Sequence, residues 1–147
     1  MTLRTSLKGG HMSEQTAKAV QLLNQLADAE TREIEVDSRH IAATKNWFVR
    51  MFYDYGLEDA KRHLEISTMI RSWLEQGKPS VGKLDVSATE LETEADSEVS
   101  VGSLAKQLLD LIDDTDAKAL LQSIVSDEEK HEQGLRALKQ RVLEQNE

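Results

Sequence analysis

Apolar residues recur three or four positions apart along most of this chain, which is the spacing of one face of an α-helix. No alternating pattern of the kind that marks strands competes with it. The pattern predicts four helices. They are expected from Ser13 to about Tyr53, from Leu57 to Gln76, from a start between Ser87 and Ser103 to about Asp113, and from Ala117 to Leu143.

Turn and capping signals lie between these helices. Ser13 can cap the first helix, and Gly56 can take the positive φ of a turn. Gly77-Lys78-Pro79 ends the second helix, and Asp114-Thr115-Asp116 can cap the fourth. The segment from Ser80 to Ala88 can cross the length of a bundle at about 3.3 Å per extended residue. An all-α four-helix bundle is therefore expected, with a crossover connection between its second and third helices.

Each expected helix has a stripe of residues that would face the core. The stripes are Val20, Leu23, Ala27, Ile34, Ile41, Phe48 and Met51 in the first helix; His63, Ile66, Ile70 and Trp73 in the second; Leu104, Leu108, Leu111 and Ile112 in the third; and Leu120, Ile124, His131, Leu135, Leu138 and Val142 in the fourth.

The composition narrows the class of protein. The 147 residues suit one domain, and 39% hydrophobic with 31% charged residues indicates a chain that folds. A net charge of −9 argues against nucleic acid as a partner, since phosphate binding needs clustered Lys and Arg. Because the chain has no cysteine, any metal must bind to carboxylates and imidazoles.

The segment from Met1 to Met12 resembles a leader or a cloning remnant, which leaves residues 13–147 as the folded domain. No apolar run approaches the roughly 18 residues of a membrane span, and the first residues lack the apolar core of a signal peptide. No membrane association and a cytoplasmic location are therefore expected.

Several ionisable residues fall on the apolar stripes, where a carboxylate without a partner loses several kcal/mol of solvation. A divalent or trivalent cation would remove that cost, and oxygen and imidazole ligands suit iron, manganese or zinc. The residues are Glu30 and Asp37 in the first helix, Asp59 and His63 in the second, Glu94 and Glu98 in the third, and Glu128 and His131 in the fourth.

The spacing of Glu128 and His131 has a specific consequence. Residues three apart project from one face of a helix, so both side chains can reach one metal ion. Such a pair is common in helices, but its place on an apolar stripe favours a metal site.

At these residues the chain resembles the bacterioferritins and the wider ferritin-like superfamily. Glu30, His40 and Lys45-Asn46-Trp47 are similar to the family's first helix. Gly77-x-Pro79 with Gly82-Lys83-Leu84 is similar to its connection after the second helix, and Asp127-Glu128-Glu129-x-His131 to its fourth-helix motif. The resemblance implies a ferritin-like four-helix bundle with a di-iron centre.

The resemblance also implies roles for particular residues. Glu30, Glu128 and His131 would bind the metal and serve catalysis, and His63 would be the histidine of the second helix. The family places a Glu three residues before that histidine, but Ala60 stands there, so Asp59 or Glu58 is the substitute expected. The third-helix ligand is either Glu94 or Glu98.

Two further expectations follow from the resemblance. Asp37 is a replacement ligand, paired with His40. The heme-binding Met of the family would fall near Lys61, so no heme is expected.

The function implied is oxidation of Fe(II) by O2 or peroxide at a two-iron site, for iron storage or detoxification. A homo-oligomer, dimer or larger, and a shell or reductase partner are expected with it. Two alternatives stay open. One is a rubrerythrin-type di-metal oxidase or peroxidase, and the other is a non-enzymatic bundle with a degenerate site, which Ala60 favours.

Overall fold

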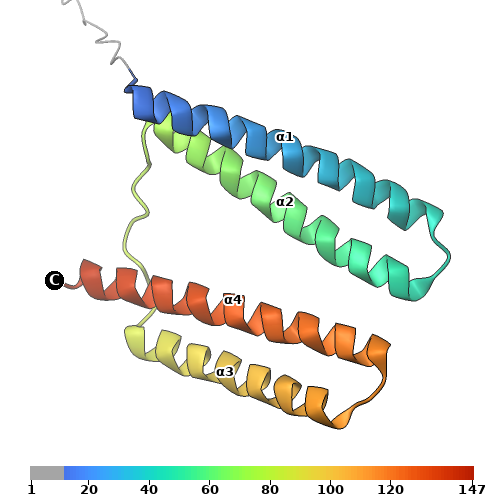
Figure 1. Cartoon of the computed structure of the whole chain (residues 1–147). Helices are drawn as coiled ribbons and strands as arrows, with labels where there is room; N and C mark the ends of the chain where they lie inside the picture. Colours follow the sequence, from blue (N-terminus) through green and yellow to red (C-terminus); the bar gives the residue numbers. More distant parts are fainter. Residues whose placement is uncertain (1–11) are drawn as a thin grey trace, which may run out of the picture. The chain divides into compact units, whose positions relative to one another are not determined.

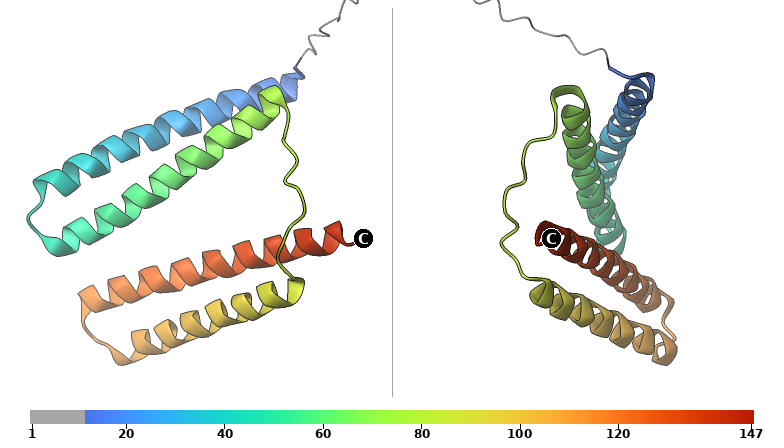
Figure 2. Two further views of the ribbon diagram at one scale, coloured as in Figure 1. Left: turned by 180° about the vertical axis from the view of Figure 1, so that it is seen from behind. Right: turned by 90° about the vertical axis from the view of Figure 1, so that its left-hand side faces the viewer.

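The computed structural model describes residues 12–147, which form four α-helices and no strand (Figure 1). The all-helical, four-helix prediction is confirmed. The chain divides into two units, one ending at Ser80 and the other beginning at Val81, and each is a pair of packed helices (Figure 2). Residues 1–11 of the expected leader are not among the described residues. The helices are α1 (Glu14–Ala43), α2 (Trp47–Gln76), α3 (Ala88–Leu111) and α4 (Thr115–Gln145).

The boundary between the first two helices differs from the prediction. α1 ends at Ala43, and α2 begins at Trp47 after a break of three residues. Asn46 causes this start because its side-chain oxygen accepts two hydrogen bonds from backbone N–H groups of the first turn, at 2.9 and 3.1 Å. The predicted helix from Ser13 to Tyr53 is therefore wrong at its end. Because the apolar stripe continues across residues 44–46, the spacing of apolar residues did not indicate that Asn46 caps a new helix.

Gly56 lies inside α2 and has no positive φ, so the turn predicted there is also wrong. The missing side chain serves close packing instead. A Cβ atom on Gly56 would lie 3.1 Å from Oδ2 of Asp37 on α1, and Asp37 is only 7% exposed. Gly56 thus leaves room for a carboxylate in the contact between the two helices.

The other boundaries follow the local signals. α2 ends at Gln76, and Gly77 follows with a φ of 95°, which glycine adopts at little cost. Ser87 caps α3 through a capping box with Glu90, so this helix starts at the early end of its predicted range. Asp114 caps α4, with its carboxylate accepting a backbone hydrogen bond at 2.8 Å.

The contact between α1 and α2 is a seam of residues three and four positions apart. The predicted first stripe is confirmed from Val20 to Ile41, where its members are half-buried. On α2 the most buried residues are Ala60 and Ser67, at 4% and 1% exposed. Their small side chains allow the helices to approach closely. Of the predicted second stripe, Ile66 is 39% exposed, whereas Ile70 and Trp73 are half-buried.

The α3–α4 seam has the same spacing and includes carboxylates. Glu98 falls within the buried series of α3, and Glu128 follows buried Val125 by one turn of α4. Both acids therefore project toward the neighbouring helix. The buried residues of the seam are Leu91, Ala95, Gly102 and Ala105 on α3 and Val125 and Val142 on α4.

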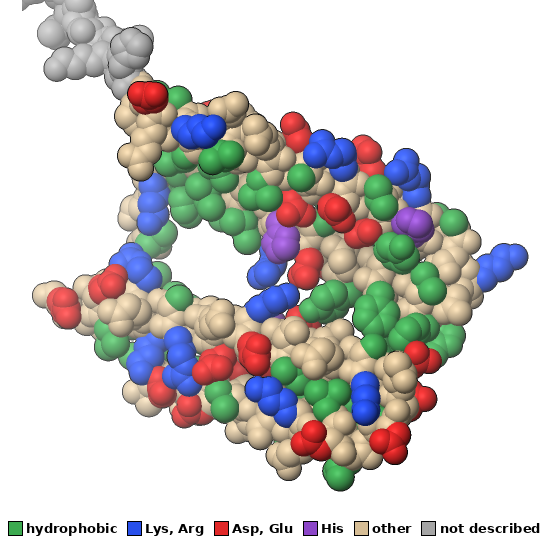
Figure 3. All heavy atoms as spheres, in the orientation of Figure 1, with side chains coloured by type: hydrophobic (Ala, Val, Ile, Leu, Met, Phe, Trp, Pro, Cys, Tyr) green, Lys and Arg blue, Asp and Glu red, His purple; other side chains and the backbone are tan. Residues whose placement is uncertain are grey.

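Many hydrophobic side chains are exposed on both units (Figure 3). The predicted third stripe is among them, with Leu104, Leu108 and Leu111 at 60%, 42% and 79% exposed, so it lies away from the α4 contact. Despite this apolar surface, no helix within residues 12–147 has the length and hydropathy needed to cross a membrane.

Replacing the cap of α2 tests the corrected boundary. Asn46→Ala should lower the free energy of unfolding by about 1–2 kcal/mol, because two backbone N–H groups lose their acceptor. Lys45→Ala, at the exposed neighbouring position, is the matched control and should change it by less than about 0.5 kcal/mol. Urea unfolding followed by circular dichroism measures both, and equal effects would contradict the capping role.

Candidate metal centre

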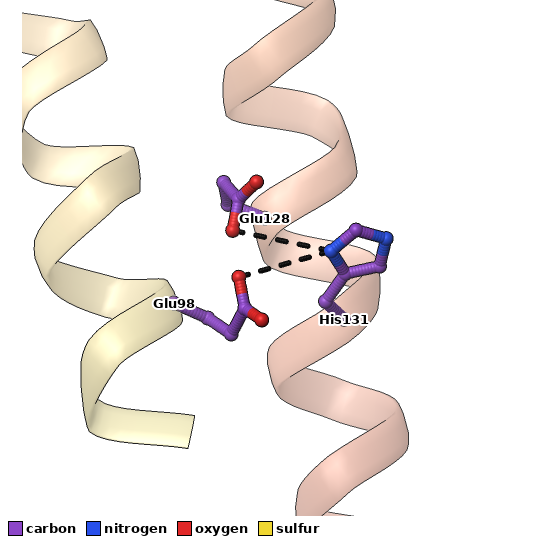
Figure 4. Close-up of side chains that lie close together, drawn as sticks. All are labelled: Glu98, Glu128 and His131. Carbon is purple, nitrogen blue, oxygen red and sulfur yellow. Dashed lines mark ion pairs between the residues drawn. The ribbon is translucent and has the colours of Figure 1, made fainter. Parts of the chain in front are cut away.

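Glu98, Glu128 and His131 come together across the α3–α4 seam (Figure 4). Nδ1 of His131 lies 3.7 Å from Oε2 of Glu98 and 3.9 Å from Oε2 of Glu128. Glu128 and His131 project from one face of α4, one turn apart, and Glu98 reaches them from α3. The structure thus brings Glu98 to the pair of Glu128 and His131 that the sequence predicted.

The separations suit a single cation. One oxygen or nitrogen atom from each residue lies within 4.8 Å of the other two. Two ligand atoms bound at about 2.0–2.2 Å to one metal are themselves about 3–4 Å apart, depending on the bond angle. Small side-chain movements would therefore bring all three donors onto one ion.

The three side chains of this cluster differ in how deeply they are buried. The side chains of Glu128 and Glu98 are 17% and 28% exposed, whereas that of His131 is 58% exposed. Oε2 of Glu128 is fully buried and has no hydrogen-bond partner. A buried carboxylate oxygen without a donor is unfavourable, and a bound cation would compensate it.

A cavity of about 190 Å³ adjoins the two carboxylates between α3 and α4. Glu98 and Glu128 line it, and His131 does not. Gly102 leaves part of the space open, since a Cβ atom there would stand 3.5 Å from Cβ of Glu128. The cluster therefore has room beside it for water or another small ligand.

The first unit holds a smaller cluster. Nδ1 of His63 on α2 lies 3.2 Å from Oε1 of Glu30 on α1. The Glu30 side chain is 15% exposed and that of His63 is 46% exposed, so again the acid lies deeper than the imidazole. These two predicted ligands are brought together, and within residues 12–147 no third ligand joins them.

Among the described residues, none of the predicted substitutes Asp59, Glu58 and Asp37 forms a group of three donors with this pair. Ala60 is 4% exposed in the seam, and neighbouring Asp59 is half-buried. Asp37 is buried against Gly56. His40 stacks on Tyr53, with ring centroids 4.4 Å apart.

On α3 the structure distinguishes the two predicted acids. Glu98 continues the buried series, three residues after Ala95 and four before Gly102. Glu94 is exposed and lies outside the cluster. The rotation of α3 against α4 therefore places Glu98, and not Glu94, beside Glu128.

Sequence reasoning missed the ion pairs that join α3 and α4. Arg136 on α4 contacts Glu92 and Asp96 on α3, at 3.2 and 3.6 Å, and Glu132 on its own helix at 3.0 Å. Lys139 also binds Glu92. The signal available was the i,i+4 spacing of Glu132 and Arg136.

These contacts shift two pKa values. Hydrogen bonds from Lys139 and then Arg136 hold the pKa of Glu92 below its ordinary value of 4.5. Hydrogen bonds to Glu132 and then Glu92 raise the pKa of Arg136 above its ordinary value. Both groups are therefore charged in neutral solution, and the network keeps the helices aligned near the cluster.

Sequence reasoning also missed an internal repeat. Adding 68 to the numbers of Glu30 and His63 gives Glu98 and His131, so each acid precedes its histidine by 33 residues. The same offset relates the helix caps Asn46 and Asp114. The two units therefore present the same donor types at equivalent positions.

Comparison of the chain with protein-family models, with curated proteins and with solved structures found no match. The resemblance to the bacterioferritins stays a prediction.

The Glu92 contacts predict a pH dependence. Because the folded pKa of Glu92 is lowered, its contribution is complete above pH 4.5 and is lost as the pH falls through the folded value. Glu92→Gln should therefore melt below wild type at pH 7, and the difference should shrink below pH 4.5. Glu94→Gln removes the same charge from an exposed position and should give no such convergence. Thermal melts from pH 7 to pH 3 measure it.

The buried oxygen of Glu128 makes a second prediction. Glu128→Gln should raise the melting temperature of the metal-free protein, because a neutral amide costs less to bury than a carboxylate without a donor. The gain expected is on the order of 1 kcal/mol. Thermal unfolding in EDTA measures it, with Glu94→Gln as the control. A clear loss of stability would show that the charge is already compensated.

Proposed function

We propose that this chain binds iron through its carboxylate and imidazole clusters and oxidises Fe(II), contributing to iron storage or detoxification. The observation that carries the proposal is the cluster of Glu98, Glu128 and His131, in which a fully buried carboxylate oxygen has no hydrogen-bond partner. A cation bound there would offset the unfavourable free energy of burying that charge.

The donor set supports iron. Two carboxylates and one imidazole suit Fe, Mn and Zn, and hard oxygen donors favour the ferric state over the ferrous state. The cavity beside Glu98 and Glu128 provides space for the remaining coordination positions. In the proposed reaction, two Fe(II) ions each give one electron to O2 and become Fe(III). The reduced O2 takes up two protons and leaves as H2O2.

The second cluster supports a pair of ions. Glu30 and His63 repeat the acid and imidazole of the other unit. We propose the ferritin-like bundle with a crossover between α2 and α3, in which each cluster binds one metal ion. A homo-oligomer and a shell or reductase partner remain predictions that accompany it.

Metal binding tests the ligand assignment. Glu98→Gln should weaken Zn(II) or Mn(II) binding by about tenfold or more, since it removes a charged ligand. Glu94→Gln, the matched control four residues earlier, should change binding less than about threefold, because it only removes a screened surface charge. Isothermal titration calorimetry measures both, and equal losses would contradict the cluster.

Oxidation of iron tests the activity. Protein loaded with Fe(II) without oxygen and then exposed to air should develop ferric absorbance faster than Fe(II) in buffer. Glu128→Gln and His131→Ala should return the rate to that of buffer. The proposal fails if the wild-type protein neither binds Fe(II) nor speeds its oxidation. Rapid peroxide turnover without iron uptake would instead favour the rubrerythrin-type alternative.

One observation favours a second candidate function. Ala60, where the family would have a glutamate, is packed in the α1–α2 seam at 4% exposed. A bundle with a degenerate site would act as a scaffold or adaptor and not as an oxidase. Its melting temperature would then be unchanged by Fe(II) or by EDTA, because no ligand binds the folded state.

A further inference from the structure

The two units have equivalent helices, but their clusters contain different numbers of donor residues. This difference points to different affinities for a cation. We infer that the α3–α4 unit is a tight cation site with three protein donors, and that the α1–α2 unit is a weak site with two. The inference rests on the proposed function, because it concerns the same ligands. It adds an order of filling, in which the first ion bound occupies the α3–α4 cluster.

The missing donor lies at one position of the repeat. The residue equivalent to Glu128 in the first unit is Ala60, since both lie three positions before the histidine. Ala60 is 4% exposed, so its methyl group fills the seam where Glu128 places a carboxylate. The α1–α2 unit thus has the helix geometry of the cluster but one charged ligand fewer.

The donors that remain in the first unit already satisfy each other. Oε1 of Glu30 and Nδ1 of His63 are 3.2 Å apart, which is hydrogen-bond distance. A cation must break that contact before it binds. In the second unit, by contrast, Oε2 of Glu128 has no hydrogen bond to lose. The two contacts of His131 there are longer, at 3.7 and 3.9 Å.

The surroundings of the clusters differ in the same direction. The cavity beside Glu98 includes Gly102 and Glu132 in its lining. The equivalent residues of the first unit are half-buried Ile34 and Leu64, which are apolar. These two apolar side chains supply no metal donors. The α3–α4 cluster can therefore complete a four-coordinate ion with water, as three-ligand zinc sites do.

Zinc titration of the whole protein tests the order of filling. Wild type should bind one Zn(II) per chain tightly and a second at least about tenfold more weakly. His131→Ala should remove the tight phase, and His63→Ala should remove only the weak phase. Two ions of equal affinity would overturn the inference and leave the proposed function standing. If no Zn(II), Mn(II) or Fe(II) binds, the proposed function fails and the inference fails with it.

Moving the carboxylate from position 128 to position 60 tests whether it causes the difference in cation affinity. Ala60→Glu should turn the weak phase into a second tight one, while Ala60→Gln, of similar size and without charge, should not. Glu128→Ala should leave two weak phases of the α1–α2 kind. In the variant carrying both Ala60→Glu and Glu128→Ala, the remaining tight phase should disappear with His63→Ala and not with His131→Ala.

Glu128→Ala keeps the test decisive if the buried substitution at Ala60 prevents folding, which circular dichroism would show. Loss of the tight phase in Glu128→Ala supports the inference. Retention of one tight ion in that variant overturns it, as does a folded Ala60→Glu protein whose second ion still binds weakly.

Discussion

A carboxylate placed in the contact between two packed helices is unfavourable unless a donor or a cation compensates its charge. Both units of this protein place a carboxylate in such a contact, at the equivalent positions Glu30 and Glu98. Glu30 finds His63, and Glu98 and Glu128 face each other with His131 at their edge. One buried oxygen of Glu128 stays without a hydrogen bond. The chemistry proposed for the chain depends on this carboxylate oxygen, which has no hydrogen bond although Nδ1 of His131 lies 3.9 Å away.

The helices position the acids through ordinary packing. Seams of small residues bring each pair of backbones close together, and capped turns of three residues at 44–46 and 112–114 join them. In the second unit, Arg136 and Lys139 bind Glu92 across the seam. These contacts link α3 to α4 beside the packed seam.

The repeat explains why the two clusters resemble each other and why they differ. A shared spacing of 33 residues sets an acid opposite a histidine in both units. Ala60 in one unit and Glu128 in the other then decide how many charged ligands each can offer. Unequal donor numbers on equivalent frameworks provide a physical basis for filling two sites in sequence.

Local sequence determined much of this fold. The four helices, the ends at Gly77 and Asp114, and the seam positions of Glu30 and Glu128 follow from spacing and capping, which act over a few residues. Only tertiary structure placed Gly56 against Asp37 and selected Glu98 over Glu94. Each residue turns a helix by about 100°, so the face that meets a neighbour depends on how the helix rotates in its packing. That rotation is set by contacts between distant residues, which local spacing does not contain.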